Sequence, residues 1–108
     1  MDDSEFIRLI EDTGAYVCAD RFCFGSLPGR DPIVLTDEED ALTQICRQYV
    51  YRGQCPRTMN MEKVYGRKQY VADIAREYHA DGILYEQIKF CDPWAYERTL
   101  GSVMLRED

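Results

Sequence analysis

One cysteine lies where the sequence predicts the end of a strand and the start of a helix. It is Cys91, within the segment DGILYEQIKFCDPWAYE (residues 81–97). Asp92 followed by Pro93 is typical of an N-cap and a first helical residue, so Cys91 is expected beside backbone N–H groups that lack helical partners. Their partial positive charge suits a thiolate metal ligand. The alternative is that Cys91 is a small packing residue, which is a common role for a free cysteine.

Three other polar residues are candidates for chemistry. Glu86 lies near the carboxyl end of the same predicted strand, where it could carry a proton or serve as a hydrogen-bonded structural carboxylate. Asp20 and Arg21 end an earlier predicted strand, at the edge where open α/β sheets place their sites. They could contact a substrate, or they could pair with each other or cap the chain.

The cysteines do not form a recognisable ligand set by themselves. The chain has five of them, with wide gaps and no Cys-x-x-Cys pair, and its one histidine, His79, falls on a different predicted element. This spacing argues against a zinc site and against a compact ferredoxin-like cluster. An odd number of scattered cysteines fits a reducing compartment rather than a disulfide framework.

The elements that would position these residues alternate between helix and strand. Apolar residues at helical spacing predict helices over 4–13, 36–49, 61–79 and 92–106, the second opened by a capping box of Thr36 and Glu39. Apolar, β-prone runs predict strands over 15–22 and 82–90. This order predicts an α/β fold with parallel strands joined by a right-handed crossover. The last helix should bury Tyr96, Leu100, Val103 and Met104.

The size and charge of the chain limit its partners. A length of 108 residues with 45% hydrophobic and 31% charged residues fits one globular domain. The net charge of −7 argues against binding nucleic acid through its phosphates, and a polyanion such as coenzyme A would need a local basic pocket. No stretch is apolar enough for a membrane span and no secretory leader is evident, so a cytoplasmic protein is expected. Two parallel strands leave open edges, which predicts self-association.

Residues 81–97 resemble the family of 2-hydroxyacyl-CoA dehydratase and benzoyl-CoA reductase subunits. Lys89, Phe90, Cys91, Asp92 and Pro93 are similar to the family's Lys-Phe-Cys-Asp-Pro motif, whose cysteine is one of three that hold a 4Fe-4S cluster. GAYVCADRFCFGS (residues 14–26) is similar to another family strand and its Cys-x-Gly turn. Arg67 is similar to the arginine that opens the helix before the ligand strand. The likeness covers most of the chain, and its specific part is the last segment.

The resemblance implies a parallel-sheet, three-layer domain of flavodoxin or Rossmann type. Family subunits are several times longer than this chain, so residues 1–108 would be one incomplete C-terminal α/β domain, truncated at both ends, of a larger iron–sulfur subunit. Cys91 would then be a cluster ligand, with the other two ligands outside the chain. The cluster would be absent or incomplete in this fragment, which would be inactive alone. Phe90 and Trp94 could shield the cluster or simply pack.

The resemblance also implies an activity and partners for the parent enzyme. Such enzymes contain a second homologous subunit and receive a low-potential electron from an ATP-dependent activator. They dehydrate a 2-hydroxyacyl-CoA through a ketyl radical, as lyases, or reduce an aromatic acyl-CoA, as anaerobic oxidoreductases. The alternative is a non-catalytic, acidic α/β module for protein interaction. Replacement of Cys91 by alanine in the full-length protein distinguishes the two, because the module needs no cysteine chemistry.

Overall fold

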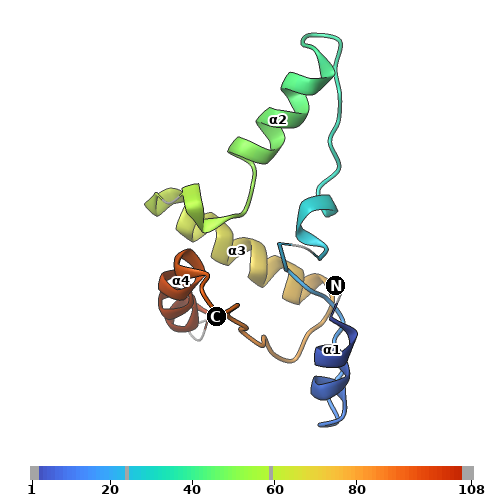
Figure 1. The fold of residues 1–108 in the computed structure, drawn as a ribbon, viewed down its shortest axis with the longest axis vertical. Coiled ribbons are helices and arrows are strands. Elements are labelled where there is room, and N and C mark those ends of the chain that lie inside the picture. The colour runs from blue at the N-terminus through green and yellow to red at the C-terminus, as the bar shows by residue number, and fades with distance from the viewer. Residues whose placement is uncertain (1–2, 24, 59, 106–108) are drawn as a thin grey trace. The chain divides into compact units, whose positions relative to one another are not determined.

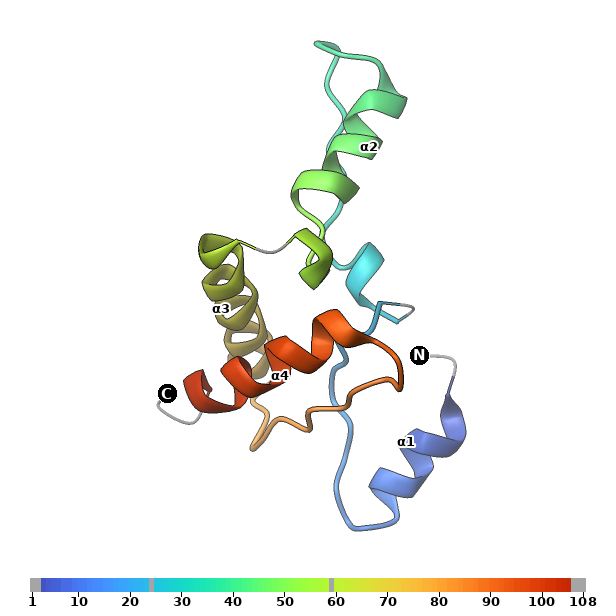
Figure 2. The same ribbon diagram turned by 60° about the vertical axis from the view of Figure 1, so that its left-hand side comes forward.

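The chain forms helices and irregular segments in two compact units, 1–54 and 55–108. The computed structural model describes residues 3–23, 25–58 and 60–105. Figures 1 and 2 show its helices. The helices are α1 (Ser4–Glu11), α2 (Ala41–Tyr51), α3 (Met61–Glu77) and α4 (Asp92–Met104), with 3-10 turns η1 (Leu27–Gly29) and η2 (Pro56–Thr58). No helix in these described ranges is long and apolar enough to cross a membrane.

The predicted α/β fold with a parallel sheet is wrong for this structure. Residues 15–22 and 82–90 are irregular, and the described part of the chain contains no strand. A strand exists only where its backbone pairs with another extended segment. Each unit contains one of the two predicted strands, and neither pairs with another described segment of its own unit. Apolar side chains of the second segment therefore remain in solvent, including Leu84 at 68% exposure.

In the first unit, both helices are capped by aspartate. The Phe6 N–H donates to Asp3 at 3.0 Å at the start of α1, which confirms the predicted first helix. Helix α2 begins at Ala41, later than the predicted capping box, because the Asp40 side chain accepts from the Thr43 N–H at 2.9 Å. The Thr43 hydroxyl and N–H groups lower the pKa of Asp40. An aspartate next to the first helical residue thus replaces the predicted box as the cap.

In the second unit, α3 carries well-defined signals at both ends. The Asn60 side chain accepts from the Lys63 N–H at 2.7 Å. At the other end His79 has a positive φ of 51°. The Ala80 N–H donates to the Ala75 carbonyl at 2.9 Å, and the His79 N–H donates to the Arg76 carbonyl at 3.2 Å. This pair of hydrogen bonds is a Schellman motif, which ends the helix. The predicted helix over 61–79 is confirmed, with its last two residues in this turn.

Helix α4 buries a different face from the predicted one. Tyr96, Leu100 and Val103 are 69%, 48% and 59% exposed. The buried residues of the helix are Glu97 and Gly101, one turn apart. The prediction that the apolar residues form the buried side was therefore wrong for these three, whereas Met104 is half-buried. The reason lies in the polar contacts of Glu97 with α3.

Candidate functional site

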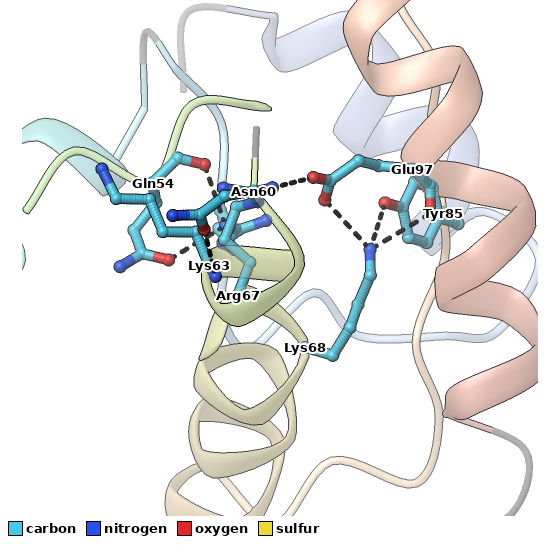
Figure 3. A network of polar contacts seen from close by, with 8 residues as sticks. Gln54, Asn60, Lys63, Arg67, Lys68, Tyr85 and Glu97 are labelled. Atoms are coloured by element: carbon cyan, nitrogen blue, oxygen red, sulfur yellow. Dashed lines mark hydrogen bonds and ion pairs between the residues drawn. The ribbon is translucent and has the colours of Figure 1, made fainter. Parts of the chain in front are cut away.

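A buried ion-pair network joins α3 to α4. Glu97 on α4 is 1% exposed, and its partners Arg67 and Lys68 on α3 are 2% and 4% exposed. One carboxylate oxygen of Glu97 pairs with Arg67 Nη2. Lys68 Nζ lies 3.4 Å from the other oxygen and donates to the Glu97 main-chain carbonyl at 3.2 Å. Figure 3 shows both cations converging on this side chain.

This network contains two cationic side chains and one carboxylate. Glu97 pairs with both cations, so the loss of its charge would remove a counter-charge that they share. Within the described part of the chain, Nε and Nη1 of Arg67 are buried without a hydrogen-bond partner. Arg67 in particular depends on Glu97, because a buried charge that loses its ion pair is far more costly than an exposed one.

Lys68 also connects the network to the segment before α4. Its Nζ donates to the Tyr85 hydroxyl at 3.3 Å and lies 5.4 Å from the centre of the Tyr85 ring. Tyr85 in turn meets Trp94, in the first turn of α4, with ring centroids 6.5 Å apart and planes at 66°. This edge-to-face geometry is favourable for aromatic pairs.

Gly101 makes room for the Lys68 side chain. A β-carbon at this position would lie 2.6 Å from Lys68 Nζ and 3.3 Å from a ring carbon of Tyr85. The absence of a side chain lets the ammonium group pass beside α4 and reach Glu97. A glycine inside a helix, normally unfavourable, is therefore explained by this close approach.

Cys91 lies at the N-cap of α4, one residue before the helix. The sequence predicted Asp92 as the N-cap, but Asp92 is the first helical residue. The Cys91 N–H donates to the Ile88 carbonyl at 3.0 Å, and its own carbonyl accepts from the Ala95 N–H at 3.2 Å. The thiol is half-buried and makes no capping hydrogen bond. It is therefore placed at the helix N-terminus, as expected.

The turn before Cys91 has an unusual backbone conformation. Phe90 has a φ of 69°, a left-handed conformation that is costly for a residue with a β-carbon. Its side chain is 88% exposed and lies beside the Lys89 ammonium, 5.2 Å from the ring centre. Trp94 is half-buried. Of the two aromatic residues near Cys91, Trp94 is thus the one that packs.

The remaining candidate residues lie elsewhere. Glu86 is exposed on the irregular segment, and its role as a proton carrier stays a prediction.

Asp20 accepts from the N–H groups of Phe22 at 3.1 Å and Ser26 at 3.0 Å. Partial burial alone would raise the pKa of Asp20, but these hydrogen bonds outweigh it and lower the pKa. Arg21 donates to the main-chain carbonyl of Gln54 at 3.3 Å. Asp20 therefore caps its own loop.

The described residues fit one ligand of an iron–sulfur cluster rather than a whole cluster. Cys91 is half-buried at a helix N-terminus, which suits a thiolate ligand. Across the described ranges, no group of three or more histidine, cysteine, aspartate or glutamate side chains could hold a metal ion. Further ligands would have to come from outside these residues.

Sequence reasoning missed Lys68, Tyr85 and Glu97 as members of one network. Glu97 and Gly101 are one helical turn apart on α4, and Arg67 and Lys68 are adjacent cations on α3. These spacings were the available signals. They were weak because charged residues on a helix are usually solvated.

Comparisons with known proteins show the family of this chain. The family described as "2-hydroxyglutaryl-CoA dehydratase, D-component" matches residues 1–108. The (R)-phenyllactyl-CoA dehydratase beta subunit of Clostridium sporogenes is 29% identical over 97 residues, which are 89% of this chain and 24% of that protein. The chain thus spans about a quarter of the length of this curated relative. No solved structure matches significantly.

Proposed function

Because the chain belongs to the 2-hydroxyglutaryl-CoA dehydratase D-component family, we propose that it acts within a subunit of an enzyme that dehydrates a 2-hydroxyacyl-CoA. The observation that carries this proposal is the family match over residues 1–108. The relative from Clostridium sporogenes supports dehydration over ring reduction, since it is named a dehydratase subunit. Its name as a beta subunit supports a second subunit as the partner.

Cys91 is the residue of this chain that would hold a 4Fe-4S cluster. Its position at the N-terminus of α4 supports this role, because helix N–H groups offset the negative charge of a thiolate-bound cluster. The other two ligands come from the rest of the subunit. When bound, the cluster supplies a low-potential electron that a separate ATP-hydrolysing activator delivers.

The other residues of the site hold Cys91 in place. Glu97 fixes α4 against α3 through Arg67 and Lys68. Trp94, in the first turn of α4, packs against Tyr85, and in this proposal its ring helps to limit the access of water and oxygen to a bound cluster. A cluster at this position requires a sulfur atom that is held in place and to which water has limited access.

The test is iron content in the full-length protein that contains this chain. The protein is purified without oxygen together with its partner subunit, and iron, acid-labile sulfide and turnover of 2-hydroxyacyl-CoA thioesters are measured. Cys91→Ser should lose the iron of one cluster and the activity. Cys46→Ser is the matched control, because Cys46 is exposed on α2 and should retain both.

Full iron content and turnover in Cys91→Ser would overturn this proposal. That outcome would favour a non-catalytic role in protein interaction. The exposed apolar residues Tyr96, Leu100 and Val103 of α4 are the observation that supports this second reading.

A further inference from the structure

Two aromatic rings close the loop that contains Cys91. Tyr85 precedes the cysteine and Trp94 follows it, and their rings meet edge to face with centroids 6.5 Å apart. Between them the chain turns through Phe90 in the left-handed region, and the Cys91 N–H is bonded to the Ile88 carbonyl. The ring contact therefore joins the two ends of a short loop that contains the cysteine.

Both ends of this loop are attached to the buried network. Lys68 Nζ donates to the Tyr85 hydroxyl at 3.3 Å and to the Glu97 carbonyl at 3.2 Å. Glu97 lies one turn after Trp94 on α4, where Arg67 pairs with its carboxylate. The same ammonium group thus contacts the segment before Cys91 and the helix after it. As Figure 3 shows, Lys68 points to Tyr85 and Glu97 together.

The loop also holds a costly backbone conformation. Phe90 is 88% exposed, so its own side chain contributes little packing to stabilise its positive φ. A strained residue persists where its surroundings fix it. Tyr85 and Trp94 hold the two ends of this loop, through their ring contact and the hydrogen bond from Lys68 to Tyr85.

We propose that Tyr85 and Trp94 form a clasp that positions the Cys91 thiol. They are positioning residues, since they act on the thiol by fixing its loop. The consequence for function rests on the proposed role of Cys91 as a cluster ligand. The clasp limits the movement of the half-buried thiol, which lowers the entropic cost of binding a preformed cluster.

The test measures how fast each cysteine of the chain reacts with iodoacetamide. A short pulse at fixed pH, followed by peptide mass spectrometry, gives separate rates for all five thiols of one molecule. Cys46 is an exposed reference, and Cys55 is a half-buried reference in the same unit as Cys91. Tyr85→Ala should raise the Cys91 rate by about tenfold, as expected when a local opening becomes easier. The Cys46 and Cys55 rates should stay unchanged.

Two variants separate the clasp from general loosening. Tyr85→Phe keeps the ring and should restore the Cys91 rate to within about twofold of the wild-type rate. Tyr96→Ala removes an exposed aromatic side chain from the same helix and should leave the Cys91 rate unchanged. If Tyr85→Ala raises the labelling rate of Cys55 as well as that of Cys91, a third variant, Trp94→Leu, is needed. It removes the other ring of the clasp but keeps an apolar side chain of similar bulk.

Three results in the Tyr85 and Tyr96 variants would overturn the clasp. These are an unchanged Cys91 rate in Tyr85→Ala, an equal rise in Tyr96→Ala, and a rise in Tyr85→Phe as large as in Tyr85→Ala. In the case decided by Trp94→Leu, a selective rise at Cys91 supports the clasp and its absence overturns it. The labelling needs no iron. Failure of the cluster proposal would instead appear as retained iron in Cys91→Ser, whatever the labelling rates show.

Discussion

At the scale of single residues, Glu97 is the most constrained side chain of the second unit. Its carboxylate is 1% exposed and is shared by two cations that are themselves buried. Replacement of a buried ion pair as a whole can be neutral, but removal of one partner leaves a charge that neither water nor protein compensates. The stability of this unit therefore depends on Glu97 more than on any exposed ion pair.

Glu97→Gln should lower the free energy of unfolding of this unit by about 3 kcal/mol, because two buried cations lose their counter-charge. The measurement is urea unfolding followed by the fluorescence of Trp94, the single tryptophan, which lies in the same unit. Asp73→Asn is the control. It breaks the Asp73–Arg76 pair, whose side chains are about 60% exposed, and should cost under about 0.5 kcal/mol. Similar losses in both variants would contradict the importance of burial.

Asp20 should make the stability of the first unit depend on acid. Its pKa in the folded chain lies below the ordinary value of 3.8, since N–H groups of its own loop bond the carboxylate more strongly than partial burial opposes it. A lowered pKa stabilises the fold above the unfolded value, and this stabilisation is lost as the pH falls through the folded value. Urea unfolding followed by circular dichroism should show that the free energy of unfolding decreases below about pH 4.

In Asp20→Asn the loss of stability at low pH should be smaller, because the asparagine amide does not titrate. The comparison is the change in unfolding midpoint between pH 5 and pH 3 in the two proteins. An identical change in both would show that Asp20 does not contribute. Glu5→Gln, on exposed α1, serves as a control for the loss of one negative charge.

At the scale of elements, the orientation of α4 depends on Gly101, which leaves room for the Lys68 side chain. An apolar stripe normally decides which face of a helix is buried. Here the stripe of Tyr96, Leu100 and Val103 is exposed, and the face with Glu97 and Gly101 packs on α3. The absence of a β-carbon at Gly101 opens the path by which Lys68 reaches Glu97.

Two glycine substitutions should therefore have opposite effects. Gly66→Ala on α3 meets open space and should stabilise the unit by about 1 kcal/mol through helix propensity. Gly101→Ala gains the same propensity but places a β-carbon 2.6 Å from Lys68 Nζ. It should destabilise the unit by about 1 kcal/mol net, because Lys68 must leave its partners. Trp94 fluorescence in urea measures both, and a stabilising Gly101→Ala would refute this role of the glycine.

At the scale of the whole molecule, the described residues bury few apolar side chains. Val64, Ala72 and Pro56 are the buried apolar side chains among them, whereas many large apolar side chains are exposed. Exposed apolar patches of this kind promote association. Self-association, expected from the sequence on the basis of open strand edges, is here expected from exposed helix faces.

Light scattering should therefore show a mass that rises with concentration. Leu100→Lys places a charge in the exposed apolar stripe of α4 and should reduce this association without lowering the unfolding midpoint. Ser102→Lys adds the same charge on another exposed face of the helix and should have little effect. A monomer at all concentrations, with one sharp unfolding transition, would count against the prediction.

The sequence by itself determined the helices of this protein, the position of Cys91 at a helix start, and a resemblance to the family that the comparison then confirmed. These features depend on neighbouring residues, through caps, periodicity and a local motif. The tertiary structure decided that residues 15–22 and 82–90 form no sheet and that α4 turns Glu97 inward. Strand pairing requires a distant partner, and the Arg67–Glu97 pair joins residues 30 positions apart. Local periodicity contains no information about such contacts.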